Sequence, residues 1–358
     1  MDILQKTRIL GDSGRYDSCG PKSCEVKIDK GLGGIYHAKA EHKTCRLFKT
    51  LMDNECSFDC KYCGNASSCK KTKASYQPEE LASLFNHLKN KLDVQGLFLS
   101  SGVNKNPDKV TEKMIESVSI LRYKYQFKGY IHFKILPGTS YELVKQASNL
   151  STRMSINLEA PNKSVLKELS SCKDYKIDIL RRQAWIKKLH KNQTTQLIVN
   201  DLATDKDILK MVDWEYQNIE MKRIYFSAFR PIKGTPLQNK DPTPLSRQNH
   251  LYNIDFLLRA YNFSIDDFKE VLEDEMLPNQ DPKLALAKLN KEKPEINEAS
   301  YNELIRVPGI GPKTAKNILN HKKRITRYEQ LRDFGVSIER AKPFIKLDGQ
   351  QQKTIIEF

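Results

Sequence analysis

Three cysteines within eight residues are the side chains of this sequence best suited to chemistry. Cys56, Cys60 and Cys63 are spaced C-x-x-x-C-x-x-C and follow a short apolar run at 46–52. Thiolates on one tight loop suit a soft metal centre, either an iron–sulfur cluster or zinc. A structural zinc site normally closes with four ligands. Three local ligands without an obvious fourth therefore favour a centre with one open coordination position.

A zinc knuckle stays open as an alternative, with Cys45 or Cys69 as its fourth ligand.

The cysteine motif, with the aromatic Tyr62 directly before the third cysteine, resembles that of the radical SAM superfamily. The resemblance implies that the three cysteines bind three irons of a [4Fe–4S] cluster and that S-adenosylmethionine binds the fourth. Reduction would then give a 5′-deoxyadenosyl radical that abstracts hydrogen from a substrate. Tyr62 would lie beside the adenine of the cofactor.

Length, charge and composition limit the class of protein. A chain of 358 residues with 39% hydrophobic side chains can form a large core domain and a small appendage. Its formal net charge of +16 favours a polyanionic partner. Eight cysteines in so long a chain do not indicate a disulfide scaffold, and Cys19 and Cys24 are interpreted as ordinary thiols. No membrane span or signal peptide is visible, which predicts a cytoplasmic protein without membrane contact.

The pattern along the chain predicts four segments: an N-terminal extension (1–44), a core domain (45–237), a helical connector (238–299) and a small all-α domain (300–358). In the core domain, helical stretches alternate with apolar runs at 46–52, 96–100, 130–136, 154–158, 195–200 and 223–229. Such alternation predicts a parallel sheet with right-handed crossovers. A doubly wound sheet fits this pattern. The resemblance favours an α/β fold with a partial, TIM-like (β/α)6 radical SAM barrel.

Polar side chains on the predicted strands indicate where a cofactor could bind. Neighbouring side chains of a strand point to opposite faces, so Asn157 and Glu159 share one face. Because buried parallel strands are usually apolar throughout, such a face predicts either a lined cavity or a strand end wetted by solvent. Lys134 and Gln196 extend the pattern to two other strands. The resemblance implies that Asn157 and Glu159 contact the ribose or methionine part of the cofactor.

The turn after the second predicted strand is a further expected contact. Radical SAM enzymes carry a Gly-Gly-Glu-like turn there that binds the amino group of the cofactor, and Ser100, Ser101 and Gly102 occupy that place. The acidic residue is absent from this turn. The segment after the sixth strand, 229–237, resembles the Pro-x-x-Gly-Thr-Pro-Leu ending of several radical SAM enzymes.

A second motif, Pro-Gly-Ile-Gly-Pro-Lys, lies in the basic C-terminal segment and resembles a helix-hairpin-helix. Gly309 and Gly311 would let the backbone approach a phosphate closely. The first amides of the following helix form an anion site, to which Lys313 and Lys316 add positive charge. The resemblance implies contact with a DNA backbone of any sequence. A protein-docking module of the same fold stays open as an alternative.

Together the two motifs resemble those of radical SAM proteins associated with DNA modification and repair. The resemblance implies an enzyme that uses a [4Fe–4S] cluster and S-adenosylmethionine to modify or repair nucleic acid, expected to be DNA. It also implies an electron donor for the cluster and a uracil-DNA-glycosylase-like partner. Two alternatives remain: an RNA-modifying radical SAM enzyme, and a non-catalytic, metal-stabilised protein that binds nucleic acid.

Overall fold

The protein, described by a computed structural model over residues 1–14, 34–40 and 43–351, divides into two units. The first comprises Met1–Ala203 and Asp207–Gln248, and the second comprises Thr204–Lys206 and Asn249–Phe358. The four segments predicted from the sequence divide the chain more finely, and that division stays a prediction. Cys19 and Cys24 lie outside the described residues.

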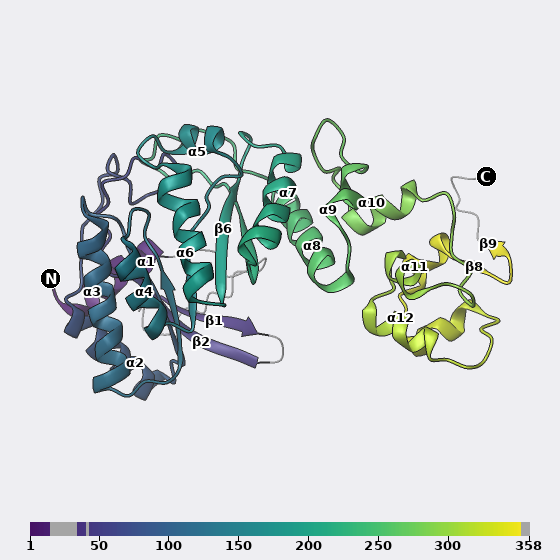
Figure 1. The fold of residues 1–358 in the computed structure, drawn as a ribbon, viewed down its shortest axis with the longest axis horizontal. Coiled ribbons are helices and arrows are strands. Elements are labelled where there is room, and N and C mark those ends of the chain that lie inside the picture. Colours follow the sequence, from purple (N-terminus) through teal and green to yellow (C-terminus); the bar gives the residue numbers. More distant parts are fainter. Residues whose placement is uncertain (15–33, 41–42, 352–358) are drawn as a thin grey trace. The chain divides into compact units, whose positions relative to one another are not determined.

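A seven-stranded sheet is the centre of the first unit (Figure 1). The strands follow one another across the sheet in chain order, and every neighbouring pair except β1–β2 is parallel. Each crossover therefore leads to the adjacent strand, and the sheet curls into a half barrel. The predicted partial barrel with six parallel strands is confirmed. The strands are β1 (Ile35–Ala40), β2 (Lys43–Leu51), β3 (Gly96–Ser100), β4 (Tyr130–Lys134), β5 (Arg153–Ser155), β6 (Gln193–Val199) and β7 (Arg223–Ala228).

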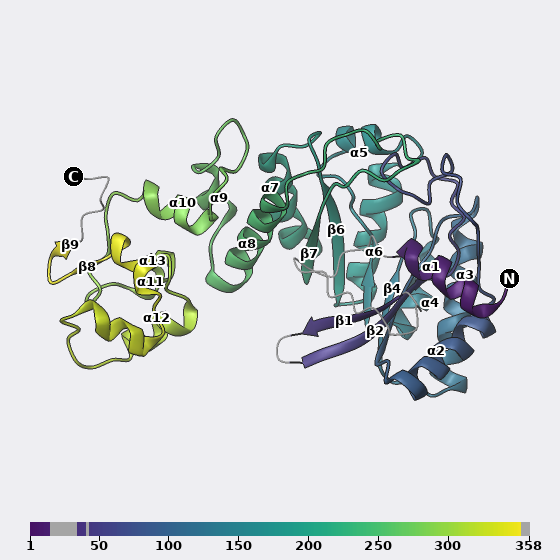
Figure 2. The same cartoon turned by 180° about the vertical axis from the view of Figure 1, so that it is seen from behind.

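The crossover helices pack side by side over one face of this sheet (Figure 1). Three of them are extended by a π-helical turn. The helical elements of the unit are α2 (Pro78–Leu92), α3 (Pro107–Ser119) with η1 (Ile120–Lys124), α4 (Tyr141–Leu150), α5 (Lys163–Leu169), η2 (Tyr175–Leu180) with α6 (Arg181–Leu189), and α7 (Asp205–Trp214) with η3 (Glu215–Ile219). The N-terminal α1 (Ile3–Gly14) packs against β2 and lies on the side of the sheet that faces the viewer in Figure 2.

The strands differ most from the sequence-based expectation at β1 and β5. The antiparallel β1 was not predicted, because it precedes the first β–α unit. The fourth predicted strand, 154–158, corresponds to β5, and its predicted end is wrong, because β5 ends at Ser155. Beyond Ser155, the Thr195 hydroxyl replaces the backbone hydrogen bonds between this segment and β6. It donates to Ile156 O at 2.8 Å and accepts from Leu158 N at 2.9 Å. Pairing resumes at Glu159.

The second unit contains a helix-hairpin-helix with its own apolar core. The hairpin helices are α11 (Tyr301–Arg306) and α12 (Pro312–Leu319), and their core includes Leu304, Ile310 and Ile318. The other elements are α8 (Leu245–Tyr261), α9 (Ile265–Lys269), α10 (Pro282–Leu289), η4 (Tyr328–Phe334), α13 (Ile338–Ala341), η5 (Lys342–Phe344), β8 (Lys346–Leu347) and β9 (Gln350–Gln351). The small β8–β9 hairpin is an addition to the predicted all-α domain.

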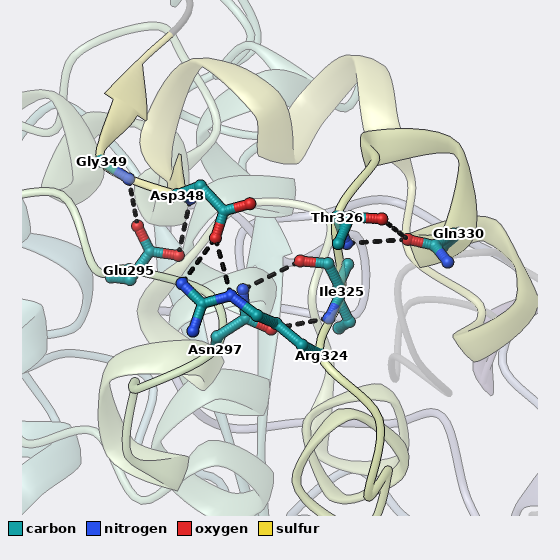
Figure 3. A network of polar contacts seen from close by, with 8 residues as sticks. All are labelled: Glu295, Asn297, Arg324, Ile325, Thr326, Gln330, Asp348 and Gly349. Carbon is teal, nitrogen blue, oxygen red and sulfur yellow. Dashed lines mark hydrogen bonds and ion pairs between the residues drawn. The ribbon is translucent and has the colours of Figure 1, made fainter.

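The highly charged composition of residues 288–298 is typical of a solvated linker, but their second half packs into the second unit. Ile296 is buried in the core of the second unit. Figure 3 shows how the polar neighbours of Ile296 fix this segment. Glu295 accepts from the amides of Asp348 and Gly349 at 3.2 and 2.9 Å. Asn297 exchanges two hydrogen bonds of 2.8 and 2.9 Å with the backbone of Ile325.

Among the helices that the structure describes, none is both long enough and apolar enough to cross a membrane.

Gly309 tests the packing of the hairpin. Its φ is +86°, and a Cβ there would lie 2.6 Å from the carbonyl oxygen of Ser337. Gly349 also has a positive φ, of +73°, but nothing lies within 4 Å of its Cβ position. We expect Gly309→Ala to lower the local unfolding free energy of α12 by about 2–4 kcal/mol and Gly349→Ala to lower it by about 1 kcal/mol. Hydrogen exchange of the α12 amides measures both, and equal effects would contradict the close packing.

Candidate active site

The three cysteines line one cavity in the first unit. The cavity has a volume of about 500 Å³ and is lined largely by residues at or just beyond the C-terminal ends of the parallel strands. Cys60 is buried, whereas Cys56 and Cys63 are half-buried. The cysteine loop begins directly after β2, so the first strand of the parallel sheet delivers the thiols to the end at which barrel enzymes carry their active groups.

Backbone amides are directed at two of the three sulfurs. Val103 N lies 3.5 Å from Cys56 Sγ, and Asn65 N lies 3.4 Å from Cys63 Sγ. Burial raises the pKa of Cys56 and raises that of Cys63 to about 12. Amide donors stabilise the charged thiolate, which is the form that binds a metal, so they oppose the effect of burial.

The turn at Ser100, Ser101 and Gly102 packs against the start of the cysteine loop. The amide of Gly102 donates to Asp53 O at 2.7 Å, and a Cβ on Gly102 would lie 2.3 Å from Glu55 O. A glycine is therefore required for this close approach. Both serines and Gly102 line the cavity, as the sequence predicted.

Glu159 enters the cavity from a strained backbone position. Its φ is +67°, a conformation that costs a non-glycine residue about 1–3 kcal/mol. Two hydrogen bonds of 2.9 Å to β6 hold it there, from Glu159 N to Gln196 O and from Ile198 N to Glu159 O. Strain of this kind is typical of functional sites, where the surrounding structure enforces it.

Lys173 is a cavity residue that the sequence interpretation missed. Its side chain is 5% exposed, and its ammonium lies 3.3 Å from Glu159 Oε1 and 5.6 Å from the centre of the Phe58 ring. Burial alone would lower the pKa of Lys173, but the adjacent Cys60 and Glu159 outweigh burial and raise the pKa above its ordinary value. A permanent positive charge therefore lies beside the cysteine sulfurs.

Asp59 fixes the segment that carries Lys173. It lies inside the cysteine motif, and its carboxylate accepts from Ser170 Oγ at 2.7 Å, Ser171 N at 3.0 Å and Cys172 N at 3.2 Å. Burial would raise the pKa of Asp59, but these hydrogen bonds hold it well below its usual range. The cysteine loop thus positions its own cationic neighbour.

Tyr62 and Asn157, the remaining predicted cofactor contacts, also line the cavity. Burial, together with the charge of Glu159 and a hydrogen bond to it, raises the pKa of Tyr62 well above its ordinary value. The structure thus brings all nine predicted metal and cofactor residues to one cavity, while their individual roles stay predictions. Other polar residues of the lining include Lys49, Asn65, Lys134, Gln196 and Arg230.

The two cysteines considered as a fourth zinc ligand do not line this cavity. Cys69 Sγ lies 3.2 Å from Gly234 O and 3.5 Å from Cys63 O, and Cys45 lies on β2. In the part of the chain that the structure describes, no three His, Cys, Asp or Glu side chains converge as the ligands of a single metal ion would. A cluster does not need this convergence, because each cysteine binds a different iron.

In the second unit, Gly311 caps the N-terminus of α12, and Lys313 and Lys316 are exposed on that helix. Gly309 serves the packing against Ser337 described above. The structure thus places all four predicted nucleic-acid residues in or beside the hairpin, and their contact with phosphate stays a prediction.

Comparisons with known proteins agree with this architecture. The radical SAM superfamily model matches residues 52–214, and a helix-hairpin-helix motif model matches residues 289–337. The chain carries a radical SAM domain and a helix-hairpin-helix motif. Radical SAM proteins are enzymes that hold a [4Fe–4S] cluster and S-adenosylmethionine, so the expected enzyme class and cofactor pair are confirmed at the level of the family. No curated protein matches the chain.

Solved structures with a similar fold share little sequence with this chain. They include the FeFe-hydrogenase maturase HydG from Carboxydothermus hydrogenoformans, with 13% identity and a TM-score of 0.48. Methylornithine synthase PylB has 14% identity and a TM-score of 0.49. These two structures cover 60% and 59% of this chain, which in turn spans 50% and 62% of theirs.

Asp59 predicts a pH dependence of stability. Because its pKa is lower in the folded than in the unfolded protein, its contribution is complete above the ordinary aspartate pKa of about 4 and is lost as the pH falls below it. We expect wild type to lose more unfolding free energy than Asp59→Asn between about pH 5 and pH 3. Urea unfolding at each pH measures this. Asp241→Asn, at an exposed position, is the control. Equal pH profiles for wild type and Asp59→Asn would show that the Asp59 carboxylate does not hold residues 170–172.

Proposed function

We propose that this protein is a radical SAM enzyme that modifies or repairs nucleic acid, with DNA as the substrate. The observation that carries the proposal is the common cavity of Cys56, Cys60 and Cys63, with amide donors beside two of the sulfurs and charged side chains around them. The helix-hairpin-helix supports a nucleic-acid substrate.

The donor set of the cavity fits a [4Fe–4S] cluster with one open iron. Three thiolates and a cluster carry net negative charge, and Lys173 supplies a buried positive charge beside them. The three cysteines would hold the cluster, and Val103 N and Asn65 N would stabilise its thiolate ligands.

The polar lining also fits S-adenosylmethionine, which has both an amino and a carboxylate group. Glu159 offers a carboxylate for an ammonium, while Lys134 and Arg230 offer positive charge for a carboxylate. Ser100, Ser101 and Asn157 add hydrogen-bonding groups, and Tyr62 adds an aromatic face for the adenine. When bound and reduced, the two cofactors supply a 5′-deoxyadenosyl radical that abstracts hydrogen from a substrate.

A nucleic-acid substrate is supported by charge as well as by the motif. The formal net charge of the chain is +16. Lys313 and Lys316 are exposed at the start of α12, where positively polarised amides also favour phosphate. Such contacts read the backbone and tolerate any base sequence. DNA is proposed on the resemblance to radical SAM proteins of DNA modification and repair, and the same resemblance suggests an electron donor and a uracil-DNA-glycosylase-like partner. The clustered thiols suit a reducing compartment and support a cytoplasmic location.

The cluster assignment predicts which cysteines matter. We expect Cys56→Ala, Cys60→Ala and Cys63→Ala each to lose bound iron and to release no 5′-deoxyadenosine from S-adenosylmethionine. Cys172→Ala and Cys45→Ala, outside the cavity, should retain both properties. Iron analysis and product chromatography after anaerobic purification and reduction measure the two properties. A wild-type protein that holds zinc and no iron would contradict the assignment.

The nucleic-acid assignment predicts a role for the charges on α12. The double variant Lys313→Glu/Lys316→Glu should bind duplex DNA at least about ten-fold more weakly and with a shallower salt dependence, because fewer counterions are released. Lys124→Glu/Lys128→Glu, exposed on the first unit, changes the net charge equally and is the matched control. Affinity is measured across a salt series for DNA and RNA duplexes. Equal losses in both variants would point to a general charge effect, and tighter RNA binding would favour an RNA substrate.

A further inference from the structure

A second cavity lies in the second unit, beside the hairpin loop, and has a volume of about 390 Å³. Gly309, Ile310 and Gly311 of the loop and Thr314 of α12 form part of its wall. The rest of the wall includes side chains that lie outside the hairpin motif, namely Tyr261, Asp281, Lys283 and Arg340.

Lys283 is the buried cation of this cavity. The residue is 8% exposed, its ammonium donates to Ile310 O at 2.6 Å, and it lies 4.7 Å from the centre of the Tyr261 ring. A carbonyl and an aromatic face neutralise an ammonium only partly, whereas a buried charge normally requires an anionic partner.

The carboxylate in the cavity is engaged elsewhere. Asp281 caps α10 by accepting from the amides of Lys283 and Leu284 at 2.9 and 3.1 Å, and it pairs with Arg340 Nη2 at 2.9 Å. The cavity thus contains one carboxylate, of Asp281, and two cations, of Lys283 and Arg340, so it carries an excess of positive charge.

The start of α12 adds donors to the same wall. Gly311 is the N-cap residue, and the amide of Ala315 donates to Gly311 O at 2.8 Å. The amides of Lys313 and Thr314 precede this first helical hydrogen bond and point out of the helix end. Buried positive charge and helix-end amides therefore meet at one cavity.

We propose that this cavity binds a backbone phosphate of nucleic acid and that Lys283, from outside the hairpin motif, supplies the cation that holds it. The inference rests on the proposed function for the identity of the phosphate, but the anion site itself does not. Lys283 also fixes the hairpin carbonyl of Ile310, so it both positions the loop and contacts the ligand.

The site should respond to pH. Burial lowers the pKa of Lys283 to about 7, Asp281 opposes this effect and Arg340 adds to it. Tyr261 is the other titratable group that faces Lys283, and burial raises its pKa. Because a bound phosphate favours the charged ammonium, affinity should fall by up to about ten-fold per pH unit above pH 7.

The test uses the full-length protein with two probes, a labelled DNA duplex and inorganic phosphate. Lys283→Met removes the charge and keeps most of the side-chain volume, and we expect a loss of duplex affinity of at least about ten-fold. Lys288→Met, an exposed lysine of the same helix, should bind as wild type does. Asp281→Asn can still cap α10 but removes the negative charge. Because this change also lowers the pKa of Lys283, the comparison is made at about pH 5.5, where Lys283 stays charged, and there the variant should bind several-fold more tightly.

A gain in Asp281→Asn cannot result from misfolding, which keeps the test decisive if Lys283→Met folds poorly. Loss in Lys283→Met, gain in Asp281→Asn and loss of the pH dependence in Lys283→Met support the proposal. Equal duplex affinity and pH dependence in wild type and both cavity variants would overturn it while nucleic-acid binding stands. If wild type binds phosphate in a Lys283-dependent manner but no duplex, the nucleic-acid function falls and the anion site stands. Binding of neither probe overturns both.

Discussion

The radical SAM domain depends on a buried ammonium held beside three cysteine sulfurs and one carboxylate. Removing Lys173 from water is unfavourable unless negative charge surrounds it, and Cys60 and Glu159 supply that charge. Further hydrogen bonds hold these charged groups in place. Asp59 holds the segment before Lys173, while two backbone hydrogen bonds hold Glu159 in a left-handed conformation. The cysteine loop, the fourth crossover and the end of the fifth strand therefore form one electrostatic unit.

The sequence predicted what depends on local spacing. The three cysteines, the apolar runs and the hairpin loop are short motifs, so their elements could be anticipated, as could the cavity that the cysteines share with residues at the strand ends. Alternation also identified Asn157 and Glu159. Both lie just beyond the end of β5, where Glu159 pairs with Leu197 of β6. Lys173 could not be found in this way. It lies between two helices in a segment without periodicity, and only the tertiary hydrogen bonds of Asp59 bring it to the cysteines.

The same distinction explains the errors. The fifth strand breaks after Ser155 because the Thr195 hydroxyl, forty residues away along the chain, replaces the backbone pairing. Residues 288–298 have a charged composition that is typical of a linker. Ile296 is nevertheless buried, because Glu295 and Asn297 bond to backbone that follows the hairpin. In both places, long-range side-chain contacts override the local pattern.

Lys173 and Lys283 are both buried but have opposite electrostatic environments, and this difference separates the roles proposed for them. Lys173 faces a carboxylate and thiols, so its pKa rises and its charge is constant in the range of physiological pH. Lys283 faces a carbonyl, an aromatic ring and a carboxylate already paired with Arg340, so its pKa falls to about 7. A constant charge suits a cofactor that stays bound through many turnovers. A charge that becomes complete only when an anion arrives suits a ligand that must bind and leave, as a substrate backbone does.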